Sequence, residues 1–192
     1  MPDRAQPTAS RASHGIRITP VGPLDPAVPA FLREPLAEVF GAEVQLSDPL
    51  PLREPWYDPR RGQYRGDYAL DALVRTCAAR PGWTLGIADA DLFVPGLTFI
   101  FGQATVGGCC GIIGLARLRP GFYGLPHDED QFRRRTLIEA VHELGHVAGL
   151  DHCPDPHCVM HFSNTIEDTD RKGPAFCARC ECEIRRLLAA PH

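Results

Sequence analysis

Apolar residues alternate with polar ones, or recur at helical spacing, along most of the chain, and this pattern divides it into strands and helices. Short runs rich in Val, Ile, Leu and Phe, bounded by Gly and Pro, predict strands at residues 14–20, 43–46, 83–94, 98–104 and 109–118. Helical spacing, with capping residues or glycines at several ends, predicts helices at residues 26–40, 65–79, 128–149 and 177–188. We therefore expect strands and helices to be mixed along the chain.

The helix predicted at 128–149 has the clearest boundaries. Asp128 is a suitable N-cap, and the Asp-Glu-Asp-Gln stretch that begins there offers a capping box. Gly149 is a suitable end, because glycine readily adopts the left-handed conformation that terminates many helices. Beyond Gly149 the sequence is irregular and rich in Cys, His and Pro until the last predicted helix. The residues with the most distinctive chemistry therefore lie around the end of this helix.

Residues 142–152 have the pattern His-Glu-x-x-His-x-x-Gly-x-x-His. On a helix, His142 and His146 lie about 40° apart around the axis and about 6 Å apart along it, so both imidazoles can bind one metal ion. A catalytic zinc ion keeps one coordination position for water and lowers the pKa of that water toward neutrality. Glu143 would stand beside the ion, where it can accept the proton of the water and pass it to a leaving amine.

The third histidine of this pattern requires a change in chain direction. On a continued helix, His152 would lie about 9 Å beyond His146 along the axis. It can join the same ion only if the chain turns back, and Gly149 lies where that turn is needed. The pattern thus predicts a catalytic zinc site with the ligands His142, His146 and His152 and with Glu143 as the general base.

A cysteine cluster follows directly. Cys153 and Cys158 are five residues apart, and Cys177 and Cys180 form a Cys-x-x-Cys pair, which is the spacing typical of a structural zinc site with four cysteines. A redox-active pair or disulfides are the alternative interpretations. Cys182 would lie about 140° from Cys177 around a helix, so we exclude it from the site. We interpret the remaining cysteines as packing residues: Cys77, Cys109 and Cys110.

Composition and charge narrow the classes of protein to consider. A chain of 192 residues can form one domain with an apolar core, and the net charge of −4 argues against a general nucleic-acid binder. We find no run long enough to span a membrane and no apolar stretch of a secretory signal, so we expect a cytoplasmic protein with reduced thiols and no membrane partner. The oligomeric state stays open. Lys172 is the only lysine among 20 lysine and arginine residues, which we interpret as an effect of genome composition.

These motifs together resemble the archaemetzincin family of metzincin metalloproteases. The family has an extended HExxHxxGxxHC motif, then CxxxxCxM, then CxxC, and here these correspond to residues 142–153, 158–160 and 177–180. Shorter stretches upstream are also similar, so the resemblance covers roughly residues 16–188; they are residues 61–64, 91–96, 99–102, 117–119 and 122–124.

The resemblance implies a metzincin-like zincin fold of the α/β (α+β) class. A mixed, twisted sheet with backing helices would lie above the zinc, and a small zinc-stabilised C-terminal lobe would lie below it. Residues 1–14 would form a flexible tail and residues 15–192 a single catalytic domain, with an upper lobe at 15–149 and a lower lobe at 150–192.

The resemblance also assigns roles to matching residues. It implies two zinc ions per chain: a catalytic zinc on His142, His146 and His152, and a structural zinc on Cys153, Cys158, Cys177 and Cys180. Met160 would pack under the catalytic zinc. The implied activity is zinc-dependent hydrolysis of peptide bonds, and some relatives are aminopeptidases acting on short peptides. The alternative is a catalytically inert zinc-binding protein that acts as an interaction module, but the intact Glu143 favours the enzyme.

Two features stay open at this point. Phe162 occupies the position at which astacin-like metzincins have a tyrosine that helps to hold the oxyanion, so another donor is needed, and Tyr123 is a weak candidate. The Gly-rich stretch at 107–111, which leads into residues 112–117, would be either an edge strand that pairs with an extended peptide or an ordinary interior strand.

Overall fold

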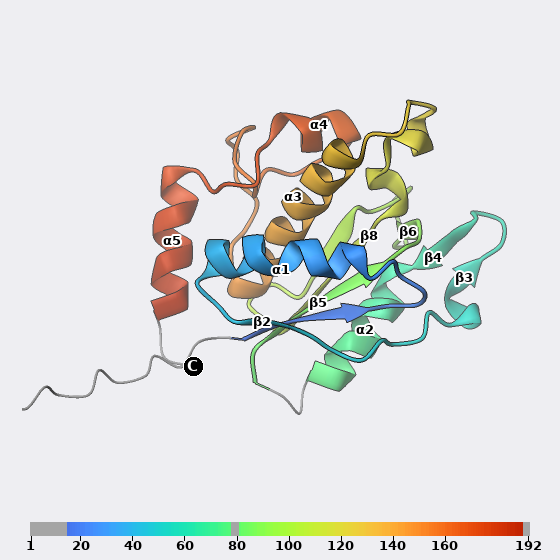
Figure 1. The fold of residues 1–192 in the computed structure, drawn as a ribbon, viewed down its shortest axis with the longest axis horizontal. Coiled ribbons are helices and arrows are strands. Elements are labelled where there is room, and N and C mark those ends of the chain that lie inside the picture. Colours follow the sequence, from blue (N-terminus) through green and yellow to red (C-terminus); the bar gives the residue numbers. More distant parts are fainter. Residues whose placement is uncertain (1–14, 78–80, 190–192) are drawn as a thin grey trace, which may run out of the picture.

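The computed structural model describes residues 15–77 and 81–189, so the tail predicted at 1–14 lies outside the described residues (Figure 1). The strands of the larger sheet are β1 (Ile16–Pro20), β2 (Val44–Leu46), β5 (Trp83–Ala88), β7 (Gly102–Ala104) and β8 (Cys110–Gly114). A smaller sheet contains β3 (Tyr57–Asp58), β4 (Gln63–Arg65) and β6 (Leu92–Phe93). The α-helices are α1 (Ala27–Phe40), α2 (Gly66–Cys77), α3 (Glu129–Ala148), α4 (Ile166–Arg171) and α5 (Ala178–Ala189).

The larger sheet is mixed, as predicted. Its strand order is β2-β1-β5-β8-β7, and only β7 runs antiparallel to its neighbour, β8. Strand β8 therefore lies inside the sheet, and the interpretation of residues 107–117 as an edge strand is wrong. The described edge on this side is β7, because the chain reverses after Ala104 through the turn at Gly107 and Gly108 and returns as β8.

Helices cover both faces of this sheet. Helices α1 and α3 contact one face, and α2 contacts β5 and β8 from the other. Side chains alternate accordingly, so that Leu85 and Ile87 of β5 belong to the apolar cluster with α1 and α3. Gly86, between them, faces Leu73 of α2 so closely that a Cβ atom there would collide with the leucine. A sheet buried on both faces gives the rigid support on which α3 rests.

The predicted helices at 26–40, 65–79, 128–149 and 177–188 are all present, but several predicted strands are longer than the observed ones. The strand predicted at 83–94 is divided, and β5 and β6 belong to different sheets. The polar residues between them explain the break, because both carboxylate oxygens of Asp91 accept hydrogen bonds from Arg117, at 2.6 and 2.9 Å. Helix α4 and the β3–β4 pair were not predicted, since they are too short to show periodicity.

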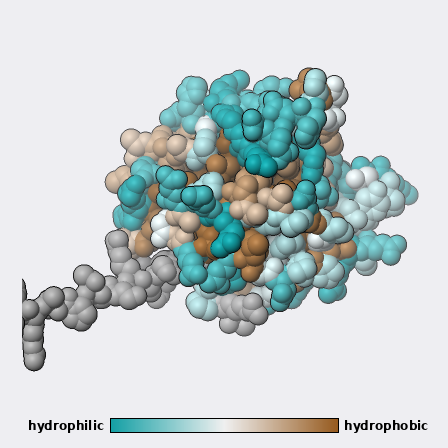
Figure 2. Space-filling model, in the orientation of Figure 1, coloured by the Kyte–Doolittle hydropathy of each residue, from teal (hydrophilic) through white to brown (hydrophobic). Residues whose placement is uncertain are grey.

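The chain after α3 folds back against it. Helices α4 and α5 both contact α3, and the main apolar cluster runs without interruption from the sheet through α3 to Val159, Met160 and Ile184. On the face shown in Figure 2, hydrophilic residues cover α4 and the start of α3. Among the described residues, no helix is long and apolar enough to cross a membrane.

Candidate active site

Helix α3 positions the first three residues of the candidate site. Asp128 caps its start by accepting a hydrogen bond from the Gln131 amide at 2.9 Å, and His142, Glu143 and His146 lie in its buried last turns. The helix ends at Gly149, whose φ of +111° is in the left-handed region that disfavours any side chain. The turn predicted there is confirmed.

After this turn His152 returns to the other two histidines. The Nε2 atom of His146 lies 3.1 Å from that of His142 and 3.2 Å from that of His152. Nitrogens that bind zinc at about 2.0–2.1 Å in a tetrahedron stand about 3.3–3.4 Å apart, which is close to the observed spacing. The three ring atoms are therefore placed as ligands of one ion would be.

Hydrogen bonds on the opposite side of the rings define which nitrogen is free. Nδ1 of His142 donates to the Val159 carbonyl, and Nδ1 of His146 donates to the Leu150 carbonyl, both at 2.7 Å. Burial lowers the pKa of both rings, and for His142 the charge of Lys172 lowers it further, so both are neutral at pH 7. Their unprotonated Nε2 atoms then face one another, an arrangement that a shared cation stabilises and that fits zinc.

Glu143 lies in the same cavity as the three histidines. The cavity has a volume of about 460 Å³ and is lined by β7, by α3 and by the chain around residues 162–164. Burial raises the pKa of the Glu143 carboxyl, and the nearby carboxylate of Glu139 raises it further. Two glycines make room for this side chain, since a Cβ atom on Gly102 would lie 2.7 Å from Cδ of Glu143 and one on Gly111 3.1 Å from its Cβ.

This close fit leads to a prediction for Gly102→Ala. The φ of Gly102 is outside the left-handed region, so the backbone tolerates alanine, but the new methyl group must displace the Glu143 carboxylate. We expect kcat for peptide hydrolysis to fall about 100-fold, the typical cost of a 1 Å misplacement, while zinc content stays unchanged. Gly121→Ala is the matched control, because a Cβ atom at Gly121 meets nothing within 4 Å. Equal activity of the two variants would contradict the argument.

Met160 packs against Gly145, in the last turns of α3 between Glu143 and His146. It is fully buried, and its sulfur lies so close to Gly145 that a Cβ atom there would collide with it. Its carbonyl accepts a hydrogen bond from the Cys153 amide at 2.8 Å, which ties this turn to the segment that carries His152. The methionine therefore packs against the part of α3 that carries the histidines.

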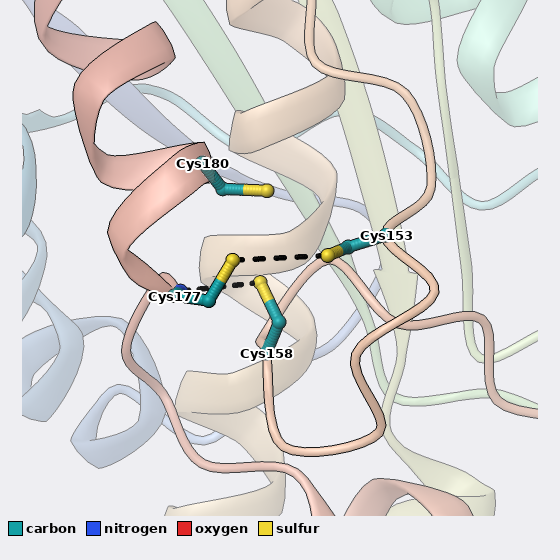
Figure 3. A group of neighbouring side chains, drawn as sticks. All are labelled: Cys153, Cys158, Cys177 and Cys180. Carbon is teal, nitrogen blue, oxygen red and sulfur yellow. Dashed lines mark hydrogen bonds between the residues drawn. The ribbon is translucent and has the colours of Figure 1, made fainter.

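The four predicted cysteines converge beside this turn. Figure 3 shows the side chains of Cys153, Cys158, Cys177 and Cys180 pointing toward a common centre, and their sulfurs all lie within 4.8 Å of one another. The sulfurs of Cys153 and Cys177 are 3.8 Å apart, the edge of a tetrahedron with zinc–sulfur distances of about 2.3 Å. Hydrogen bonds lower the pKa of Cys177 to about 7, and the bond with the Cys180 backbone has the largest effect. The lower pKa favours the thiolate form that binds a metal ion. Cys182 is exposed and lies outside this cluster.

Sequence reasoning missed a buried ion pair at the back of the cavity. Lys172 is fully buried; its Nζ lies 3.2 Å from Oε1 of Glu139 and donates to the His161 carbonyl at 3.2 Å. Glu139 also accepts a hydrogen bond from Thr169 at 3.0 Å. This pair joins α3 to the segment after α4 directly behind His142. The available signal was that Lys172 is the only lysine, which we attributed to genome composition.

The structure also bears on the open question of the oxyanion donor. Phe162 lines the cavity and packs its ring against His152, with centroids 4.9 Å apart, so it supports the third histidine but offers no hydroxyl. Tyr123 does not line the cavity; its hydroxyl donates to the Arg117 carbonyl at 2.9 Å. The buried Ser163 hydroxyl lines the cavity, has no hydrogen-bond partner within residues 15–77 and 81–189, and is a better-placed polar group.

Comparison with known proteins identifies the family of this chain. Residues 60–186 match the model of peptidase family M54. The archaemetzincin of Methanocaldococcus jannaschii is 40% identical over 166 residues, which cover 86% of this chain and 89% of that protein. The archaemetzincin of Pyrococcus abyssi is 43% identical over 181 residues, covering 90% and 95%.

Solved structures agree in fold as well. The crystal structure of archaemetzincin from Methanopyrus kandleri superimposes with a TM-score of 0.82 at 34% identity and covers 95% of this chain and all of that one. The archaemetzincin of Archaeoglobus fulgidus, in complex with malonate, gives a TM-score of 0.75 at 33% identity and covers 88% and 99%. The family model matches well over half of the chain, and the curated relatives match over most of their length. This chain therefore belongs to peptidase family M54, the archaemetzincins, and is a zinc metallopeptidase.

Proposed function

We propose that this chain hydrolyses peptide bonds with His142, His146 and His152 as the ligands of a catalytic zinc ion and Glu143 as the general base. The observation that carries the proposal is the convergence of three histidine Nε2 atoms beside a carboxylate in one cavity. A zinc ion bound there supplies Lewis-acid polarisation of the scissile carbonyl and lowers the pKa of water. Glu143 accepts the proton of the attacking water and passes it to the nitrogen of the leaving amine.

The substrate backbone is proposed to pair with β7. This strand has β8 on one side, and its residues Gly102, Gln103 and Ala104 line the cavity. An extended peptide that adds to a sheet edge gains main-chain hydrogen bonds, and its scissile bond then passes between β7 and the histidines. We thus assign the pairing with an extended peptide to β7 and not to residues 107–117.

The second zinc ion is proposed to bind Cys153, Cys158, Cys177 and Cys180. Two zinc ions per chain would then hold the chain that follows Gly149. We regard residues 150–192 as the lower lobe of a single catalytic domain at 15–192, with the upper lobe at 15–149. The continuous apolar cluster between the two parts supports one domain. None of the eight cysteines forms a disulfide, which supports a reducing compartment such as the cytoplasm as the site of action.

Short peptides with a free N-terminus are the proposed substrates. Asp151 is exposed and lines the cavity, whereas the other two carboxylates of the described lining, Glu139 and Glu143, are buried. An exposed carboxylate beside His152 is suited to hold the ammonium group of a substrate. The acidic residues near Asp128 do not serve this purpose, because Asp128 caps α3 and Glu129 pairs with Arg133 on the surface.

A comparison of free and N-acetylated peptides tests this proposal. We expect the zinc-loaded protein to cleave free peptides preferentially. Asp151→Asn should lower kcat/KM for free peptides about 10- to 100-fold, the cost of losing a hydrogen bond to a charged group, and should leave acetylated peptides unaffected. Asp71→Asn, an exposed aspartate on α2 outside the cavity, is the control. Equal cleavage of both peptide classes would refute the aminopeptidase assignment, and cleavage of neither would refute the peptidase mechanism.

A further inference from the structure

Three cysteines outside both proposed zinc sites come together on the sheet face covered by α2. Cys77 is the last residue of α2, Cys110 is the first of β8, and Cys109 directly precedes it. Their three sulfurs lie within 4.8 Å of one another, and those of Cys109 and Cys110 are 3.5 Å apart. From the sequence we interpreted these residues as packing positions, because free cysteine behaves as a small apolar residue. The fold brings them together although Cys77 and Cys109 are 32 residues apart in the chain.

The number and type of donors restrict which ion fits. The group consists of three thiols, with no His, Asp, Glu or further Cys of the described residues among them. Structural zinc sites take four protein ligands, whereas three soft sulfurs suit a soft, singly charged ion that is stable with three ligands. At metal–sulfur distances of about 2.3 Å, a trigonal site places its sulfurs about 4.0 Å apart, within the range of this cluster. We propose that Cys77, Cys109 and Cys110 form a binding site for one Cu(I) ion.

The surroundings of the cluster suit such a site. The thiol of Cys77 donates to the Cys109 carbonyl at 3.4 Å, which holds the end of α2 against the start of β8. Cys77 and Cys110 are buried, but Cys109 is half-buried and gives an ion a way in from solvent. Burial raises the pKa of the Cys109 and Cys110 thiols, so an ion that binds there must displace their protons.

This site is separate from the catalytic one. Cys110 faces α2 within the second apolar cluster, while the next residue, Gly111, packs against Glu143 on the α3 side. Strand β8 thus lies between the two, and copper bound at the cysteines touches none of the catalytic histidines. The Cu(I) proposal consequently stands independently of the proposed peptidase mechanism.

The test is a Cu(I) titration of the zinc-loaded protein without oxygen, in competition with a Cu(I) chelator and with a chromophore that reports released zinc. We expect one equivalent of Cu(I) to bind without release of zinc, and X-ray absorption at the copper edge to report three sulfur ligands. Cys109→Ser should lower the Cu(I) affinity by about 100-fold or more. Mutation of a residue that only supports a metal ligand already lowers metal affinity by about 10- to 100-fold, and Cys109 would be a ligand itself. Cys182→Ser, an exposed cysteine outside both clusters, should bind as the wild type does.

Peptide hydrolysis by Cys109→Ser serves as the check on folding, because this half-buried residue does not line the catalytic cavity. Retained hydrolysis together with lost Cu(I) binding supports the site. Release of one zinc for each Cu(I) taken up would show that copper occupies the four-cysteine cluster and would overturn the proposal. Equal Cu(I) affinity of Cys109→Ser and Cys182→Ser would overturn it as well.

Discussion

Replacing Glu143 with glutamine should lower kcat/KM for peptide hydrolysis by about 10²- to 10⁴-fold, the usual contribution of a general base, or about 3–5 kcal/mol of transition-state stabilisation. Glutamine has the same shape, so it keeps the contacts with Gly102 and Gly111. It removes only the ability to accept a proton. Zinc content should equal that of the wild type, because Glu143 is not one of the three clustered histidines.

Stability measurements separate this effect from misfolding. The Glu143 carboxyl is buried, so a neutral amide should leave the melting temperature equal or raise it. Glu129→Gln, on the exposed start of the same helix, is the matched control and should retain full activity, since an exposed ion pair contributes little. Equal hydrolysis by Glu143→Gln and the wild type would remove Glu143 from the mechanism. Absence of hydrolysis in all three proteins would favour the inert zinc-binding module.

Replacing Cys177 with serine should abolish binding of one of the two expected zinc ions and weaken binding of the other by about 10- to 100-fold. Cys153 is covalently next to His152, and its amide donates to the Met160 carbonyl, so the four-cysteine cluster holds the segment that presents the third histidine. Zinc bound to such a cluster contributes on the order of 10–16 kcal/mol to folding in small metal-dependent domains. We therefore expect the irregular chain after Gly149 to depend on this cluster for its order.

Zinc titration with a competing chelator measures this coupling, and limited proteolysis reports the order of residues 150–189. Cys182→Ser is the matched control, because Cys182 lies on the same helix, α5, but outside the cluster. It should bind two zinc ions and resist protease as the wild type does. Unchanged affinity at the histidine site in Cys177→Ser, with unchanged protease resistance, would show that the two sites are independent.

Local spacing accounts for the part of the site that could be predicted. His142 and His146 share a helix face because residues four apart always do, and Gly149 reverses the chain because glycine accepts a φ of +111° without steric cost. The cap at Asp128 depends on atoms three residues apart. Such features are set by covalent geometry over a few residues, so the pattern around residues 142–152 was sufficient to predict them.

Contacts between distant parts of the chain could not be predicted in this way. The pair of Lys172 with Glu139 and the meeting of Cys77 with Cys109 and Cys110 join segments more than 30 residues apart. The placement of β7 at the sheet edge likewise depends on which strands pair.

The sequence by itself determined the family, the helix that carries the histidines and the spacing of the proposed ligands. Only the tertiary structure decided which strand borders the cavity, that the single lysine is buried behind His142, and that three further cysteines meet under α2. The physical reason is that short-range structure follows from the backbone and its side chains, whereas long-range contacts follow from how apolar faces of helices and strands bury one another.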